Sequence, residues 1–407
     1  MRFVQNFRLK VLLGLVIGVI CFTLVAGAVW QVGTIYLPSM LRSQMLGKAN
    51  LLADHLLHAS TYQALERGYA AAYLAANRDP FLADKVRQFR QQGDAELDKA
   101  MVLAEELLAD NWGNATFNGS YERVLAARKA VAEMRRRIDA ASGQPPVAPG
   151  QWVETMSALV EAGADLRLAA FTPSNDLHAA AFFNTSIKQA IWLAAEYTGR
   201  ERAAIAIVLA SGQPISAETS AQLQGYRGIV DRQMRYLSQT ARPLLEGIES
   251  PLGEDYRKAW AAVERHYLGD FERMRAQVHA ETATGNYSID QQQWLESATA
   301  AVNTLLDFNT VVSLHSQSLT QTSADMSRFW LAMAGLVTVA DLALAAGALW
   351  VIFYASRRIR EPEQVMSRIR EKNDLTGRLP DDGRDELSGM ARAFNNMMEK
   401  LSSSPPR

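Results

Sequence analysis

Two long apolar runs constrain the architecture of this chain more than any other feature of its sequence. Residues 11–30 carry no charged side chain, and residues 329–355 form a second apolar run that contains one charge, Asp341. Each run is long enough to cross about 30 Å of hydrocarbon as a helix. The first also exceeds the apolar region of about 7 to 15 residues found in a cleaved signal peptide. The sequence therefore predicts a protein that crosses a lipid bilayer twice.

Basic residues beside the two runs predict the orientation. They precede the first run and follow the second: Arg2, Arg8, Lys10, Arg357, Arg358 and Arg360. Because Lys and Arg favour the cytoplasmic side, we expect residues 1–10 and the segment after 355 in the cytoplasm. Residues 31–328 should then lie outside the cytoplasmic membrane. Within the second run, we expect a protonated Asp341 to form a hydrogen bond with Asp341 of a second copy of the chain in a dimer, and we assign it no chemistry.

The external region reads as helices broken by turns, because its apolar residues lack the alternation of strands. Seven turn signals rich in Gly, Pro and Asn fall near residues 79–80, 111–114, 142–150, 172–175, 211–214, 249–253 and 284–286. The eight helices between them predict an all-α fold of two four-helix bundles, stacked along the membrane normal. Hairpins such as 142–150 should form the far tips.

Two segments of this region resemble each other. Residues 66–75, ERGYAAAYLA, align with residues 201–210, ERAAIAIVLA, and each segment is followed by a proline. In both, the arginine shares a helical stripe with the leucine seven positions later. We interpret the two halves as diverged repeats whose corresponding helices bring Arg67 and Arg202 into one core. Small neighbours such as Gly68 and Ala203 would leave room between the backbones.

Two buried guanidinium groups require negative charge nearby, because burying an unpaired charge costs several kcal/mol. In one interpretation, Glu66 and Glu201 close ordinary ion pairs, or Glu196 does so with Arg200 one turn later. In the other, a small bound anion supplies the charge and is held by the planar guanidinium forks. Spacing alone leaves both interpretations open.

The same segments, read in their wider contexts ALERGYAAAYLA and EYTGRERAAIAIVLASG, carry a family resemblance. They resemble the paired arginine signatures of the nitrate- and nitrite-sensing (NIT) domain, a sensor module of bacterial receptors built as two four-helix bundles. The resemblance spans roughly residues 45–310. It implies that arginines on facing helices bind an oxyanion, a role that motif position carries onto Arg67 and Arg202, with Arg200 beside them. Tyr69 and the alanines after it replace the family's small hydroxyl residues, which leaves nitrate, nitrite and other small anions open.

The cytoplasmic segment, residues 356–402, resembles a second family. Its apolar residues recur with the 3-4-3-4 spacing of a coiled-coil seam: Leu387, Met390, Phe394, Met397 and Leu401. With Pro362 in the first helix and an Asp-Glu pair before the second, the segment resembles the HAMP signal-relay domain. This implies a homodimer that forms a parallel four-helix bundle. Glu363 follows Pro362 where an apolar residue is usual, so Val365 and Ile369 are expected to carry the first-helix seam.

A lone amphipathic helix on the membrane surface is the alternative for this segment. Residues 403–407 leave no room for a kinase, a cyclase or a methylated signalling helix. We therefore expect either a shortened gene product or a cytoplasmic signalling partner.

Other function classes find little support. A formal net charge of -1 gives no nucleic-acid signature, and the single cysteine, Cys21, allows no intramolecular disulfide. No phosphate loop, nucleophile elbow or Cys-His pair is present, so we expect neither an enzyme nor a cofactor. Asp54 and His58, with His55 between them, could share a helical face, but no further metal ligand is nearby. We predict no metal site.

The sequence thus predicts a homodimeric receptor of the bacterial inner membrane that senses nitrate or nitrite in the periplasm and relays the signal through HAMP. A partner-binding membrane protein without a small ligand is one alternative. The other is a chemoreceptor-type sensor of organic acids, with four further arginines as candidates: Arg123, Arg128, Arg232 and Arg235.

Overall fold

The computed structural model describes residues 9–75, 79–112, 114–140, 147–171, 183–247, 251–372, 376–384 and 386–402. The regular elements among these residues are all helical. The chain divides into two compact units. The larger comprises Leu41–Asp325, and the smaller combines Met1–Met40 with Met326–Arg407.

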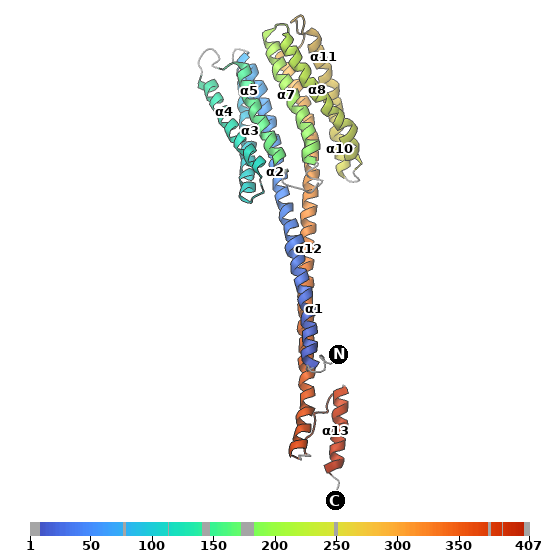
Figure 1. Ribbon diagram of the computed structural model, residues 1–407. Helices are drawn as coiled ribbons and strands as arrows, with labels where there is room; N and C mark the ends of the chain where they lie inside the picture. The colour runs from blue at the N-terminus through green and yellow to red at the C-terminus, as the bar shows by residue number, and fades with distance from the viewer. Residues whose placement is uncertain are drawn as a thin grey trace. The chain divides into compact units, whose positions relative to one another are not determined.

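The larger unit contains two helical bundles, labelled in Figure 1. The first is formed by α2 (Leu37–Ala75), α3 (Pro80–Ala109), α4 (Ala115–Ala140) and α5 (Pro149–Ala169). The second consists of α7 (Lys188–Ser211), α8 (Ala217–Tyr236), α9 (Arg242–Glu246), α10 (Pro251–Ala262), α11 (Glu272–Glu281) and the first part of α12 (Gln291–Lys372). Three π-helical segments, η3 (Phe183–Ile187), η4 (Leu237–Ala241) and η5 (Val263–Phe271), join or interrupt these helices.

Local sequence signals set several helix ends. Asp79 caps α3, because its carboxylate accepts the backbone N–H of Phe81 at 2.9 Å, and Pro80 occupies the first turn. Ser216 caps α8 in the same way. Gly212 ends α7 with a positive φ of 61°, a conformation that glycine adopts without steric cost. These ends fall at the predicted turn signals.

Some predicted features lie outside the described residues. They are the break at 172–175, most of the hairpin at 142–150, the first eight residues of the chain and the tail at 403–407.

The two bundles lie side by side (Figure 1), so the prediction that they stack end to end is wrong. Contacts between α2 and α7 join Asp54 with Lys188, and Arg67 with Glu196, which means that the two helices run along each other in the same direction. The reason is that the stripes carrying Arg67 and Arg202 run along the lengths of their helices. Only lateral packing of α2 against α7 buries both stripes.

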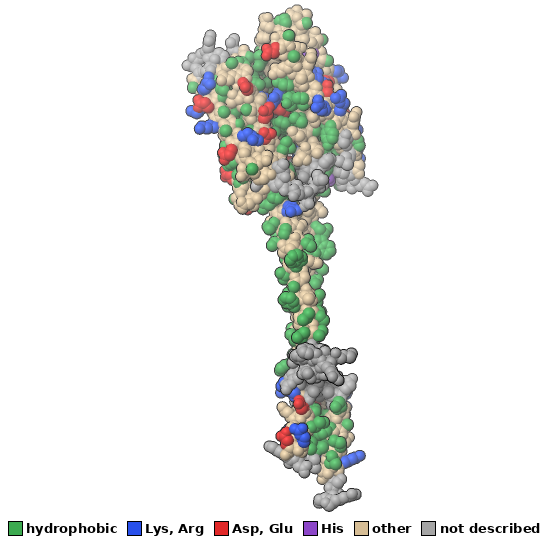
Figure 2. Space-filling view, in the orientation of Figure 1, with side chains coloured by type: hydrophobic (Ala, Val, Ile, Leu, Met, Phe, Trp, Pro, Cys, Tyr) green, Lys and Arg blue, Asp and Glu red, His purple; other side chains and the backbone are tan. Residues whose placement is uncertain are grey.

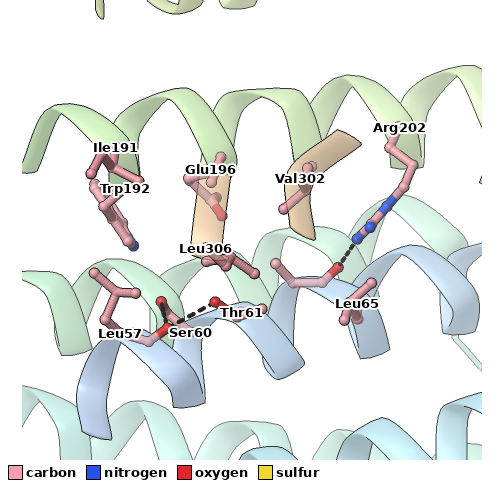
Figure 3. A pocket seen from close by; sticks show the side chains of 13 residues that line it. Leu57, Ser60, Thr61, Leu65, Ile191, Trp192, Glu196, Arg202, Val302 and Leu306 are labelled. Carbon is pink, nitrogen blue, oxygen red and sulfur yellow. Dashed lines mark hydrogen bonds between the residues drawn. The ribbon is translucent and has the colours of Figure 1, made fainter. Parts of the chain in front are cut away.

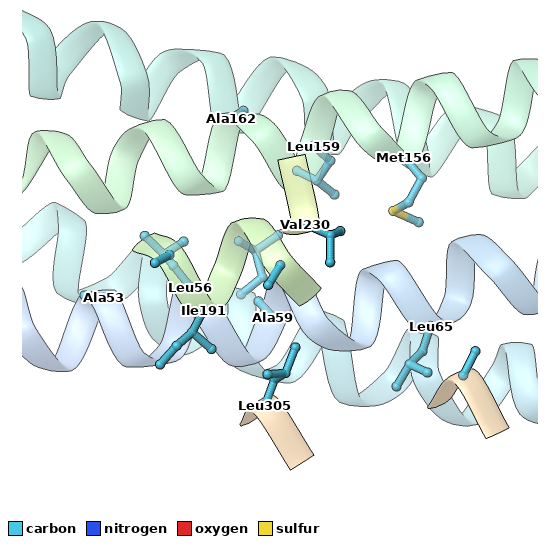
Figure 4. Close-up of a cluster of buried hydrophobic side chains, with 14 of the residues drawn as sticks. Ala53, Leu56, Ala59, Leu65, Met156, Leu159, Ala162, Ile191, Val230 and Leu305 are labelled. Atoms are coloured by element: carbon cyan, nitrogen blue, oxygen red, sulfur yellow. The ribbon is translucent and has the colours of Figure 1, made fainter. Parts of the chain in front are cut away.

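One continuous apolar core extends through both bundles. Figure 4 shows part of it, with Leu56 and Leu65 of α2, Leu159 of α5, Ile191 of α7 and Leu305 of α12 among the side chains drawn. Burying a side chain of this size stabilises a fold by about 1.5–3 kcal/mol. Separating the bundles would expose these residues, which explains why both bundles belong to one compact unit.

The smaller unit contains α1 (Leu9–Gln31), η2 (Val32–Tyr36), the second part of α12 and α13 (Glu386–Ser402). A small buried cluster is formed by Val365 of α12, Ala391 of α13 and Leu379 of the connector, the segment between these two helices. Ile369 and Phe394 pack against it. The side-chain amide of Asn395 in α13 bonds the backbone of Leu379 through both its oxygen and its nitrogen, at 2.9 and 2.8 Å. The connector is thereby fixed to α13.

Two stretches of helix in the described part of the chain are long and apolar enough to cross a membrane. They lie within Gly14–Ala75 and Gln291–Tyr354, and their most apolar windows are unburied. Large exposed side chains there include Phe22, Trp30, Leu344 and Phe353. Figure 2 shows apolar side chains along these helices on the face that it draws.

Candidate functional site

Arg67 of α2 lies in the interior of the larger unit with its side chain fully buried. Its guanidinium donates to both carboxylate oxygens of Glu196 in α7, at 2.6 and 3.0 Å, and to the Ser157 hydroxyl of α5 at 2.8 Å. This bidentate pair joins the first bundle to the second. The ion-pair interpretation is therefore correct for Arg67, although its partner is Glu196 rather than its neighbour Glu66.

Arg202 of α7 is equally buried but has a different environment. It donates to the backbone carbonyl of Ala64 at 2.7 Å and to the Thr299 hydroxyl at 3.1 Å, and its Nε has no hydrogen-bond partner. Among the described residues, no carboxylate forms an ion pair with Arg202. The pKa of Arg202 is lowered to about 10, mainly by burial; the charge of Arg67 also lowers it, whereas Tyr69 and Glu196 raise it. The group remains cationic near neutral pH without an adjacent anion.

The two arginines approach each other through glycines. A Cβ atom at Gly68 would lie 3.2 Å from Arg202 Nε, so Arg202 packs directly on the α2 backbone. A Cβ atom at Gly199 would lie 3.4 Å from Arg67 Nη2 and 4.0 Å from Arg202 Nη2. Both guanidinium groups thus flank Gly199, and the structure brings together the two residues that the repeat predicted to share a core.

Glu66 and Glu201, the residues before the two arginines, face the opposite way. Glu66 accepts from Arg135 of α4 and Arg90 of α3, within the first bundle. Glu201 accepts from Arg275 and His279 of α11, within the second, at 2.7 and 2.9 Å. Each Glu-Arg pair therefore holds its own bundle together through the glutamate and presents the arginine to the other bundle.

The equivalence of the two halves extends to the residues that support the arginines. The indole N–H of Trp152 bonds the backbone carbonyl of Arg67, and that of Trp294 bonds the carbonyl of Arg202. Five positions after each tryptophan stands a hydroxyl, Ser157 or Thr299, that accepts from the same arginine. Both arginines are thus fixed at main chain and side chain by a matching set of groups.

Arg200, the third predicted site residue, connects this interior to the surface. Its Nε donates to Glu196 at 2.7 Å, its terminal nitrogen pairs with Glu161, and its guanidinium lies 5.0 Å from the Tyr197 ring. Burial alone would lower the pKa of Arg200, but Glu196 and Glu161 raise it well above its usual value. For Glu196, burial raises the pKa of the carboxyl group, but the charges and hydrogen bonds of Arg67 and Arg200 lower it by more. The pKa of Glu196 is therefore below its usual value, and the carboxylate is ionised near neutral pH.

A cavity of about 20 Å³ lies beside these groups between α2, α7 and α12 (Figure 3). Arg202, Glu196 and Gly199 line it with the hydroxyls of Ser60 and Thr61, and the remaining lining residues are mostly apolar. The volume exceeds the roughly 10–15 Å³ that a single water requires. The cavity therefore combines a buried cation, hydroxyl groups and apolar walls at the size of a very small molecule.

Other candidate residues do not join this site. Asp54 bonds Lys188 and Ser313, whereas His55 contacts Glu96, so the described structure places these groups in polar contacts between helices. The four arginines considered for an organic acid also lie apart from the cavity. Arg123 and Arg128 pair with aspartates at the surface, and Arg232 and Arg235 are exposed.

Residues 61–317 match the family model described as nitrate and nitrite sensing (NIT), and residues 350–403 match that of the HAMP domain. No curated protein matches the chain. A solved structure, that of the NasR transcription antiterminator, is similar in fold with a TM-score of 0.55 and 15% sequence identity, covering 88% of this chain and 91% of that one.

Proposed function

The chain belongs to the family of nitrate- and nitrite-sensing domains, here followed by a HAMP signal-relay domain, and on this premise we propose that it is a transmembrane receptor for nitrate or nitrite. The anion would bind in the cavity between α2 and α7, on Arg202 and Arg67, with Arg200 close by. The signal would pass to the HAMP domain.

The buried charge of Arg202 is the observation that carries this proposal. An isolated guanidinium in a protein interior is unfavourable unless it gains a charged partner. Arg202 faces the cavity, donates only to neutral oxygens, and keeps an unused N–H on Nε. A planar oxyanion accepts two parallel hydrogen bonds from such a fork, which makes nitrate or nitrite a suitable partner.

The size of the cavity supports a small ligand of modest affinity. Nitrate has four heavy atoms, and at a ceiling of about 1.5 kcal/mol per atom it gains roughly 6 kcal/mol, which corresponds to tens of micromolar. A dicarboxylate would need several more polar groups in a larger space than about 20 Å³. The site therefore favours the oxyanion over the organic-acid alternative.

The exposed apolar helices support a membrane location. Phe329 and Trp330 begin the second apolar stretch, and Trp350 and Tyr354 lie near its end, with all four side chains exposed in this chain. Aromatic residues at both ends of an apolar helix match the two membrane–water interfaces. We place residues 11–30 and 329–355 in the bacterial inner membrane, the NIT domain in the periplasm and both termini in the cytoplasm.

The surface of α13 supports a homodimer. Met390, Met397 and Leu401, three residues of the predicted seam, are about half exposed or more in the single chain, at 65%, 51% and 52%. A continuous apolar stripe of this kind is buried when two copies form a coiled coil. Because α12 runs from Gln291 to Lys372, a small shift of this helix in the NIT domain would reach the two HAMP domains of the homodimer directly.

Binding is tested by calorimetric titration of the full chain in lipid nanodiscs. Nitrate or nitrite is expected to bind with a Kd on the order of tens of micromolar, whereas chloride, malate and succinate should give no saturable heat. Saturable binding of a dicarboxylate alone would replace the proposal with an organic-acid receptor. Absence of binding by every anion would favour a partner-binding protein whose arginines serve only its internal packing.

Dimerisation through α13 is tested by cysteine crosslinking in membranes, in a Cys21→Ser background. Met397→Cys is expected to give a disulfide-linked dimer on mild oxidation, because seam positions of two parallel helices bring their Cβ atoms within disulfide range. Glu399→Cys, two positions on and therefore on the opposite side of the helix, is the matched control and should remain monomeric. Equal crosslinking at both positions would argue against an ordered seam.

A further inference from the structure

We propose that Glu196 is a built-in competitor of the anion: its carboxylate occupies Arg67, and anion binding moves it onto Arg200. This inference rests on the proposed function and assigns to Glu196 control over affinity at that site. Glu196, rather than Arg67, lines the cavity, so an anion that contacts Arg202 meets this carboxylate before it can reach Arg67.

The Glu196 carboxylate has the features of the proposed ligand. It is a planar monoanion whose two oxygens accept from two nitrogens of Arg67 at 2.6 and 3.0 Å, the geometry in which a guanidinium fork also binds an oxyanion. Its side chain is almost completely buried, so it forms this pair away from solvent. Nitrate and this carboxylate cannot hold the same two donors at once.

The two repeats differ at this position. Glu196 stands six residues before Arg202, and Thr61 stands six residues before Arg67 in the matching helix. Both residues line the cavity, but only the second repeat supplies a carboxylate. One internal carboxylate therefore faces two buried guanidinium groups, which leaves one positive charge in excess. An entering anion would compete with Glu196 for Arg67 and would also compensate the charge of Arg202.

Arg200 remains a partner of the displaced carboxylate. Its Nε already donates to Glu196 Oε1 at 2.7 Å, so a side-chain rotation that leaves Arg67 keeps this ion pair. Arg200 also lines a groove of about 610 Å³ between α5, α7 and α8, where the carboxylate would gain access to water. Withdrawal of Glu196 would enlarge the cavity of about 20 Å³ beside Arg202 at the same time.

This exchange explains how binding could reach the rest of the molecule. The Arg67–Glu196 pair joins α2 to α7, and the Arg200–Glu161 pair joins α7 to α5. Moving one carboxylate between the two arginines weakens the first connection while an anion bridges Arg67 to Arg202 in its place. The contacts between the two bundles would therefore change although the total charge of the protein groups stays the same.

The test compares nitrate affinities of full-chain variants in lipid nanodiscs. Glu196→Gln removes the competing charge, so nitrate binding should tighten by about tenfold, as expected if Arg67 is available in only about a tenth of the wild-type molecules. Arg200→Gln removes the cationic donor that holds the displaced carboxylate and should weaken nitrate binding by about tenfold. The matched control is Glu154→Gln, which makes the same charge change in the groove that Arg200 lines, without an ion pair to these arginines, and should bind nitrate as the wild type does.

The double variant separates this mechanism from direct contact of Arg200 with nitrate. If Arg200 serves only to receive Glu196, then Glu196→Gln/Arg200→Gln should bind nitrate as tightly as Glu196→Gln alone. Binding as weak as that of Arg200→Gln would overturn the inference, as would unchanged or weaker binding by Glu196→Gln. If Glu196→Gln folds poorly, the Arg200→Gln variant still retains Glu196, and unchanged nitrate binding by that variant would also overturn the inference. If no variant and no wild-type chain binds nitrate or nitrite, the proposed function itself fails.

Discussion

The substitution Arg202→Met is expected to abolish nitrate binding while the free energy of unfolding, measured without nitrate, stays within about 1 kcal/mol of the wild-type value. Arg202 donates to neutral oxygens and forms no ion pair within the described structure, so its removal leaves no buried charge unpaired. Each hydrogen bond that is lost between this cation and a neutral oxygen contributes about 1.5–3 kcal/mol, and loss of the unfavourable burial of a cation, which costs several kcal/mol, offsets this. Methionine fills a similar, flexible volume.

The effect on affinity should be much larger. Charge-assisted hydrogen bonds contribute about 1.5–3 kcal/mol each, so the loss of a bidentate fork corresponds to a weakening of at least about 100-fold. Calorimetric titration measures the affinity, and chemical denaturation measures the stability of the same sample. Arg232→Met, at an exposed arginine of α8, is the control for the charge change. Normal nitrate affinity in Arg202→Met would place the ligand elsewhere.

Much of the fold follows from local signals in the sequence. Pro80 and Gly212 mark helix ends because each acts through the backbone of its own residue, independent of the rest of the molecule. The arrangement of the bundles does not follow in this way. Side-by-side packing depends on the complementarity of α2 and α7, which are far apart in sequence, and eight helices of similar length are compatible with either arrangement.

At the site, too, some features follow from local sequence signals and others do not. The repeated Glu-Arg pair indicated that Arg67 and Arg202 share a core, and the structure places both guanidinium groups beside Gly199. The bidentate contact of Glu196 with Arg67 spans 129 residues and has no local signature. The supporting groups did leave a signal, since a tryptophan followed five positions later by a hydroxyl residue occurs as Trp152 with Ser157 and again as Trp294 with Thr299. Extending the repeat beyond the Glu-Arg segment would have identified them.

The substitution Arg67→Met, unlike Arg202→Met, is expected to lower the free energy of unfolding, by about 3 kcal/mol or more. Removing one partner of a buried ion pair typically costs about 3–5 kcal/mol, because the remaining charge stays buried. Glu196 would retain only the single bond from Arg200, and Ser157 would lose its donor. Chemical denaturation in the absence of nitrate measures this loss.

A second substitution tests whether the buried carboxylate causes the loss. Arg67→Met/Glu196→Gln removes the uncompensated charge and should recover most of the lost stability, because a neutral amide is far less costly to bury than an isolated carboxylate. If the double variant is no more stable than Arg67→Met, the loss comes from packing around the arginine stem rather than from charge. Recovery of stability would mean that two arginines in matching positions of the repeats differ for one reason: in the anion-free protein Glu196 compensates the charge of Arg67, whereas Arg202 forms no ion pair within the described structure.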